Sequence, residues 1–293
     1  MAEALAATAP VQGLWTDAWQ RLRRSRAAIV AATLLLLVIV LAVVGPWLSA
    51  YTVEQVDWSQ ATLATPPSLA NGHWFGTDAN GRDLFVRVWI GTRMSLLVAL
   101  LSTLVSVMIG VAWGATAGYL GGRVDDWMMR FVDVLYALPY MFFVIILTVV
   151  FGRGPLTLLA AIGAFGWLTM ARIVRGQAQS LREREFVEAA VVGGAGTLRI
   201  VLRHIVPNLL GPVIVFATLT VPQVILVESF LSFLGIGIQE PLASLGNLIA
   251  DGAAEMETAP WILAVPAGCL VLLVFCFNFL GDGLRDALDP RDR

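Results

Sequence analysis

The sequence has no lysine and few charged residues of any kind, which make up 14% of its 293 residues. A Walker A phosphate loop needs its lysine to reach the β- and γ-phosphates of a nucleotide, so hydrolysis by that route is excluded. A soluble domain carries about a quarter charged residues, and this chain has too little polar surface to cover one. Its net charge is −2 with no basic patch outside short loops, which argues against a nucleic-acid partner.

Cysteine and histidine are also scarce. Cys269 and Cys276 lie in one apolar stretch, where a helix would separate them by about 10 Å, too far for a disulfide. His73 and His204 are distant in sequence from each other and from any cysteine at metal-binding spacing. The run 78–83 resembles a calcium loop but places Arg82 where a ligand is needed. We therefore expect no catalytic constellation, no metal site and no cofactor held by this chain.

Hydrophobic residues make up 58% of the chain, and the mean hydropathy is +0.79. They form long uncharged runs instead of the alternating ten-residue segments of a membrane β-barrel. Backbone groups in lipid must then be satisfied within helices. The pattern predicts an all-α membrane protein with six transmembrane helices, because six stretches reach the length of about 18 to 25 residues that a span requires. They are 27–48, 94–122, 134–152, 154–171, 205–227 and 258–281.

Arginine placement predicts the orientation of these spans. Four arginines precede the first span (Arg21, Arg23, Arg24 and Arg26), which places the amino terminus in the cytoplasm by the positive-inside rule. Six spans return the carboxyl terminus to the same side, leaving fifteen arginines inside and four outside (Arg82, Arg87, Arg93 and Arg153). The first apolar run is too long for the core of a cleavable signal peptide. Before it, Trp15, Trp19 and Leu22 indicate a short interfacial helix.

Two segments between the spans are long. Residues 49–92 are rich in turn-forming pairs and are expected outside the membrane. Residues 172–204 are expected to form a cytoplasmic helix-turn-helix that breaks at Gly193 and Gly194. In its second helix, Thr197 is expected to cap the start. An apolar stripe follows at helical spacing, formed by Leu198, Val201, Leu202 and Ile205.

Two acidic residues lie in or beside the spans and are candidates for a substrate pathway, since acids in membranes are costly. Asp133 follows Arg130 by three positions, so an ion pair on one helix face is the simpler interpretation. Glu228 is expected either at the outer interface or in the lining of a pore. Gly110, Gly114 and Gly118 form a stripe of small residues that lets a second helix of the same chain approach closely. Prolines within three spans indicate kinks.

One segment carries a family resemblance. Glu188, Ala189 and Ala190, followed by Gly194 and Pro207, match the spacing of the EAA motif of ABC importer membrane subunits. Four further blocks, 73–88, 170–177, 228–241 and 278–293, are similar to the same proteins. Together they resemble the C-type permease subunits of the bacterial oligopeptide and dipeptide ABC importers. One departure is Leu245, where that family has tryptophan, and it is expected to affect only a loop contact.

The resemblance implies the ABC type I permease fold, with a core at 93–282 after an amino-terminal part at 1–92 and before a cytoplasmic tail at 283–293. It implies that the segment 183–207 couples this chain to an ATPase through Arg184, Glu185, Glu188, Ala189, Ala190, Gly194 and Pro207. The implied partners are a homologous B-type permease, two subunits that bind ATP and magnesium, and an external substrate-binding protein. The complex would import peptides through the bacterial inner membrane.

Other functions remain alternatives at this point. An ion-coupled secondary carrier would use Asp133 and Glu228, but it predicts inverted repeats with broken helices at the membrane midplane, and none is evident in the sequence. A membrane scaffold without transport is a third class. Within the ABC importers, nickel, glutathione and cell-wall peptides are alternative cargoes.

The topology leads to a labelling prediction. In a cysteine-free background, Asn71→Cys and Glu255→Cys should react with an impermeant thiol reagent added to intact cells, because both positions are expected outside. Arg184→Cys should react only after the cells are permeabilised. The reverse pattern would overturn the orientation derived from the arginines.

Overall fold

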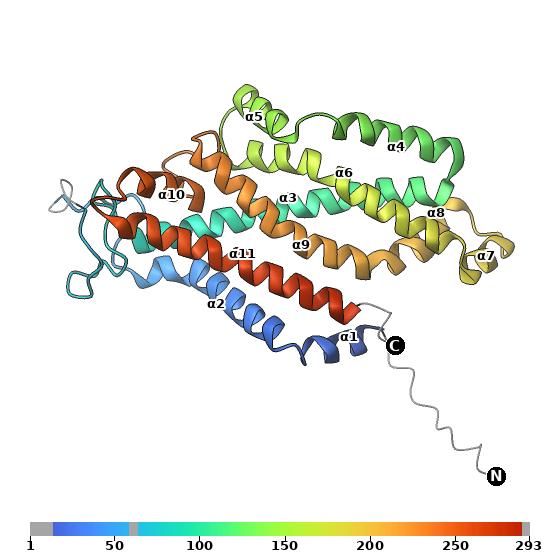
Figure 1. Ribbon diagram of the computed structural model, residues 1–293, viewed down its shortest axis with the longest axis horizontal. Helices are drawn as coiled ribbons and strands as arrows, with labels where there is room; N and C mark the ends of the chain where they lie inside the picture. Colours follow the sequence, from blue (N-terminus) through green and yellow to red (C-terminus); the bar gives the residue numbers. More distant parts are fainter. Residues whose placement is uncertain (1–13, 59–63, 289–293) are drawn as a thin grey trace, which may run out of the picture.

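The computed structural model describes residues 14–58 and 64–288, and in these residues helices are the only extended regular structure (Figure 1). In chain order the elements are α1 (Leu14–Leu22), α2 (Arg26–Leu48), α3 (Leu84–Leu120), α4 (Gly122–Tyr136), α5 (Tyr140–Phe151), α6 (Pro155–Arg182), α7 (Glu185–Val192), α8 (Thr197–Ile200), a π-helical turn η1 (Val201–Ile205), α9 (Val206–Phe233), α10 (Leu245–Ala254) and α11 (Pro260–Leu288).

The described residues contain five helices that are long and apolar enough to span a membrane, or the expected six if one bent pair of helices counts as a single span. The helices α2, α3, α6 and α11, and the continuous run Thr197–Phe233, are long and apolar enough to cross a membrane. The sixth span is the pair α4 and α5, bent by 76°. The prediction of one helix over 134–152 was therefore wrong. Pro139 precedes α5, and proline lacks an N–H and disfavours helical geometry in the residue before it.

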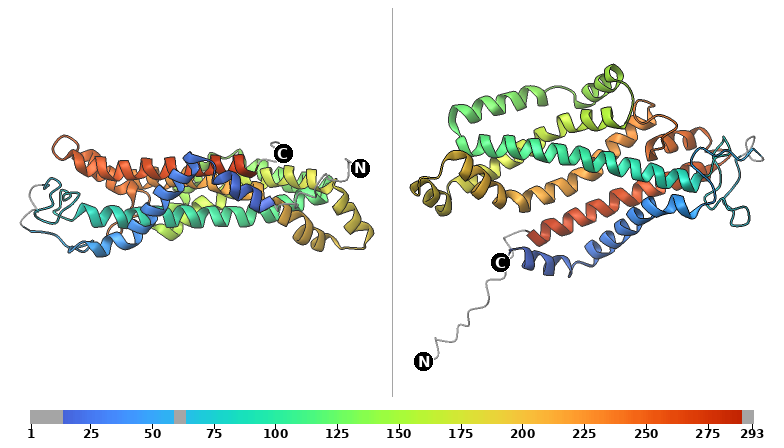
Figure 2. Two further views of the ribbon diagram at one scale, coloured as in Figure 1. Left: turned by 90° about the horizontal axis from the view of Figure 1, so that it is seen from below. Right: turned by 180° about the vertical axis from the view of Figure 1, so that it is seen from behind.

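The long helices lie side by side in an elongated bundle (Figures 1 and 2). One end, called here the α10 end, carries α10 and the segment between α2 and α3. The opposite end, called the α7 end, carries α7 and α8 (Figure 1). The helix α1 packs against α11, where Leu22 lies next to Gly283 near the carboxyl-terminal end of α11. The expected domain boundaries fall within helices, since 92 and 93 belong to α3 and 282 and 283 to α11.

The glycine stripe of α3 lies in a close contact between two helices. A Cβ atom added to Gly110 would lie 2.6 Å from Cβ of Met170, and one added to Gly118 would lie 2.8 Å from Cβ of Ala178. At Gly114 the added atom would overlap the carbonyl oxygen of Ala171. The prediction of a contact within the chain is confirmed, and the partner helix is α6.

The segment 172–204 differs from its prediction. Its first part, through Arg182, continues α6. The expected break at Gly193 and Gly194 is present between α7 and α8, but the second part is not a separate helix, because it runs without a break through η1 into α9. The wider π-helical turn shifts the helix phase. As a result Leu198 and Leu202, expected in a buried stripe, are 71% and 60% exposed. Thr197 does not cap the helix, because Gly196 holds that position without a side-chain bond.

The interfacial helix predicted before the first span is present as α1. Its Trp19 is exposed, and the guanidinium of Arg23 lies 5.9 Å from the indole ring. The side chain of Trp15 lies outside the described part of the structure. A separate helix, α2, then begins after Ser25, whose hydroxyl accepts from the backbone N–H of Ala28.

A large side chain in the glycine stripe should disturb the bundle. Gly114→Leu would force α3 away from α6 and should cost about 1–3 kcal/mol through overpacking. We expect a lower thermal unfolding temperature of the purified protein, measured by fluorescence-detected size exclusion. Leu97→Ala, at an exposed position of the same helix, should be much milder. A parent-like unfolding temperature for Gly114→Leu would contradict the packing.

Candidate functional site

The α7 end presents a short helical hairpin. Val187 is buried in an apolar cluster with Ala178 of α6 and Ile200 of α8, which holds α7 against the bundle. After α7 the chain turns in a Schellman motif, in which the N–H of Ala195 donates to the carbonyl of Ala190 at 3.0 Å. Gly194 supplies the left-handed conformation at φ +76° that this turn requires.

Most residues expected to couple to an ATPase are exposed on this hairpin. Arg184 precedes α7, and Glu185 and Glu188 lie in its first turn, where the helix dipole favours carboxylates. Ala189, Gly194 and Pro207 are exposed as well, whereas Ala190 is half-buried. The hairpin also leaves large apolar side chains uncovered, with Val192 89% exposed. A surface that combines charged and uncovered apolar side chains is typical of an interaction site.

A second feature is a partly open cavity of about 570 Å³, called here the central cavity, lined by α3, α6, α9 and the bend between α4 and α5. It lies halfway along the bundle. Its lining includes Thr103 and Thr169, which are within one residue of the midpoints of α3 and α6, and Thr220 near the midpoint of α9. Aromatic rings of Tyr140 and Phe165 form part of its wall.

Asp133 lies beside this cavity but does not line it. Its carboxylate accepts a hydrogen bond from Arg172 of α6 at 2.7 Å, so the expected pair with Arg130 was wrong. Arg130 is exposed on α4, whereas the packing of α4 on α6 brings Arg172 to the acid. The same guanidinium stacks on the ring of Tyr136 at 3.9 Å, and Tyr136 does line the cavity.

A second ion pair joins the same two helices. Arg175 donates to both carboxylate oxygens of Asp125 at 2.6 Å, and Gln179 adds a bond at 3.1 Å. A bidentate guanidinium–carboxylate pair is strong and geometrically specific. These contacts fix α4 to α6 and so fix the wall of the central cavity.

Glu228 lies near the carboxyl-terminal end of α9, next to α10, and does not line the central cavity. Its side chain is fully buried between α3, α9 and α10. Its carboxylate accepts from the hydroxyls of Ser95 at 2.7 Å, Ser232 at 2.8 Å and Ser229 at 3.3 Å. Because it is sealed by these serines, Glu228 is in contact with neither the central cavity nor solvent.

The serines extend this anchor to the segment after α9. The backbone N–H of Leu245 donates to the hydroxyl of Ser95 at 3.3 Å, and that of Ile238 donates to Ser232 at 3.2 Å. Leu245 is fully buried at the start of α10, so the expectation that it affects only a loop was wrong. Glu228 therefore holds α10 on the bundle.

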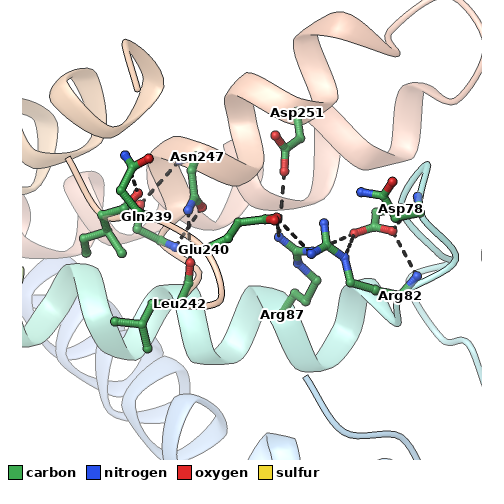
Figure 3. A network of polar contacts seen from close by, with 11 residues as sticks. Asp78, Arg82, Arg87, Gln239, Glu240, Leu242, Asn247 and Asp251 are labelled. Atoms are coloured by element: carbon green, nitrogen blue, oxygen red, sulfur yellow. Dashed lines mark hydrogen bonds and ion pairs between the residues drawn. The ribbon is translucent and has the colours of Figure 1, made fainter. Parts of the chain in front are cut away.

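A third polar cluster joins the two segments at the α10 end (Figure 3). Asp78 accepts bonds from Arg82 and from Arg87, each at 2.8 Å, and Arg82 also donates to Glu240 at 2.8 Å. Asp251 lies 3.8 Å from Arg87. The hydrogen bond from Arg82 lowers the pKa of Glu240, whereas burial raises the pKa of Asp251.

In the sequence, Asp78 stands only in the rejected calcium-like run 78–83, far from Glu240. Nothing in the local sequence points to this contact. In the structure the carboxylate of Asp78 accepts hydrogen bonds from Arg82 and Arg87. His73 is buried nearby and bonds Asp83 at 2.8 Å, and in the described residues no three metal-ligating side chains come together.

Comparison with known proteins shows which family has this architecture. The family model described as "Binding-protein-dependent transport system inner membrane component" matches residues 110–293. The chain belongs to this family. A second model, "N-terminal TM domain of oligopeptide transport permease C", matches residues 13–67. The chain is thus a membrane permease subunit, which confirms the function class implied by the resemblance.

Several curated relatives are similar over nearly the whole permease. The oligopeptide transport system permease protein OppC of Haemophilus influenzae is 52% identical over 96% of this chain and 90% of its own length. OppC of Escherichia coli strain K12 is 53% identical over 96% and 93%. The dipeptide transport system permease protein DppC of Bacillus subtilis is 46% identical over 94% and 86%.

The fold is also that of a solved transporter. A chain from inward-facing structures of the MetNI methionine ABC transporter aligns with the permease at a TM-score of 0.56 and 18% identity. The alignment covers 70% of this chain and 96% of that one. The expected type I permease fold is confirmed.

The burial of Glu228 yields a stability prediction. Glu228→Ala would leave the serine hydroxyls without their acceptor, and an unsatisfied buried polar group costs about 1–3 kcal/mol. We expect a clear fall in the thermal unfolding temperature, with a smaller fall for Glu228→Gln, which keeps an acceptor and the volume. Glu255→Ala, outside this cluster, is the control. Equal unfolding temperatures for all three variants and the parent would refute the anchoring role.

Proposed function

We propose that the permease is the C-type membrane subunit of an ATP-driven importer that carries oligopeptides into the bacterial cytoplasm. The observation that supports this best is its 52–54% identity, over 96% of the chain, to proteins named oligopeptide transport permease OppC. In one organism, Bacillus subtilis, the relatives named as dipeptide and as oligopeptide permeases are 46% and 44% identical to this chain, so dipeptides are the alternative cargo.

The α7 hairpin is the proposed contact with the ATP-binding subunits. Within the segment 183–207, Glu185 and Glu188 supply charge, and the exposed Val191 and Val192 supply apolar surface that a partner would cover. The adjoining helix runs from Thr197 to Phe233 over 37 residues. A movement of the hairpin would therefore reach the wall of the central cavity through one continuous helix. ATP and magnesium are held by the partner subunits in this proposal.

The remaining partners follow from the orientation. We place the α7 end and both termini in the cytoplasm, in agreement with the arginine asymmetry. The α10 end then faces the substrate-binding protein, and a homologous B-type permease completes the passage beside the central cavity. In this arrangement residues 93–282 form the transport core of a protein of the bacterial inner membrane.

The ion-coupled carrier is disfavoured by the placement of its two acids. Glu228 is sealed by serines and has no contact with the central cavity. Asp133 is paired with Arg172. A carrier needs an acid that exchanges protons or ions with its pathway, and neither residue is placed to do so.

Uptake by the reconstituted complex tests the function. The permease with its B-type partner, two ATPase subunits and the binding protein should accumulate tripeptides to pentapeptides in vesicles only when ATP is present. Dipeptides, glutathione and nickel serve as competing cargoes. ATP-independent uptake, or preference for one of the competing cargoes, would contradict the proposal.

The same assay tests the α7 hairpin. Glu188→Lys reverses an exposed charge, so the fold should survive, but ATPase subunits should co-purify poorly and uptake should fall by at least about tenfold, as expected for a charged contact at an interface. Asp286→Lys makes the same charge change on an exposed position of α11 and should leave both properties near the parent. If the two variants behave equally in co-purification and uptake, α7 is not the contact with the ATPase subunits.

A further inference from the structure

The central cavity offers polar groups that find no partner within the described protein. Gln223 of α9 lines the cavity with an exposed side chain. Thr103 lies in the facing wall, is 5% exposed, and its hydroxyl has no hydrogen-bond partner. An amide and a hydroxyl each donate and accept hydrogen bonds. Halfway through a membrane, such groups are costly unless the occupant of the cavity satisfies them.

The lining has no ionised side chain. None of its residues is aspartate, glutamate, arginine, lysine or histidine. The nearest charges described here, Asp133 and Arg172, form an ion pair at 2.7 Å, and the ring of Tyr136 separates this pair from the cavity by stacking on Arg172. Glu228 is buried away from the lining.

The unpaired polar groups and the absence of charge together restrict which ligand can fill the central cavity. A lipid chain would leave Gln223 and the hydroxyl of Thr103 without hydrogen bonds. A fixed ionic group would have no counter-charge in a weakly polar site, where an unpaired charge is unfavourable. A chain of neutral amide groups fits both conditions, because each amide offers one N–H and one carbonyl, and the aromatic walls accommodate varied side chains.

We propose that the central cavity is a binding subsite for the main chain of the transported peptide, with Gln223 and Thr103 as its hydrogen-bonding contacts. Since the wall carries no charge, this subsite does not distinguish cationic from anionic side chains. The inference rests on the proposed peptide transport and adds to it the part of the cargo that this subunit contacts.

Charge substitutions at Gln223 test the subsite. In the reconstituted complex, uptake of Ala-Lys-Ala is compared with uptake of Ala-Glu-Ala, both as tripeptides. Gln223→Glu should raise the ratio of cationic to anionic uptake by about fivefold or more over the parent, and Gln223→Lys should lower it similarly, because charges within about 6 Å in a weakly polar site interact at this level. Gln223→Met and Thr103→Val should keep the ratio and raise KM for both peptides.

Gln239→Glu and Gln239→Lys are the controls, since this glutamine lies at the α10 end outside the cavity lining. Their uptake ratios should equal that of the parent. If the Gln223 charge variants keep the parent ratio while the complex imports peptides, the subsite is wrong and the transport function stands. If they instead prevent assembly with the B-type permease, a partner side chain fills the cavity and the inference also fails. A parent complex that imports no peptide overturns the proposed function itself.

Discussion

The close contact between α3 and α6 is the interaction on which the rest of the bundle depends. In lipid there is little hydrophobic gain when helices associate, so contact relies on close packing. Gly110, Gly114 and Gly118 let the backbone of α6 approach where any side chain would collide. This approach sets the position of Arg172 and Arg175, which in turn hold α4. The wall of the central cavity is thus a consequence of three missing side chains on α3.

Charged clusters that hold segments together lie at the α10 end, whereas the lining of the central cavity has no charged side chain. At the α10 end, Asp78 and Glu240 bind arginines and join the segment before α3 to the segment after α9. Glu228 bonds serine hydroxyls and holds α10. Most buried polar atoms of the two clusters are hydrogen-bonded within them, whereas Nε of Arg87 has no partner. The central cavity is left neutral, which suits a passage that binds its cargo weakly enough to release it.

The α7 hairpin is joined to a long apolar helix without an intervening loop. The hairpin is closed by the Schellman turn at Gly194 and anchored by Val187. It continues through η1 into α9 without a loop. A π-helical turn is a weak point in helix geometry and is often found at functional sites. Here it lies between α8 and α9, on the path by which the proposed coupling would reach the central cavity.

The sequence by itself determined the number of spans, the glycine contact of α3 and the positions of most helices. These features depend on run length, spacing and backbone chemistry within one segment, and the bilayer allows few alternatives. The EAA spacing also identified the family. Only the tertiary structure decided that Asp133 pairs with Arg172, that Glu228 is sealed by serines, and that Arg82 meets Glu240, 158 positions away. The partner of a charged group depends on which helices pack together. Residue spacing within one segment does not predict that packing.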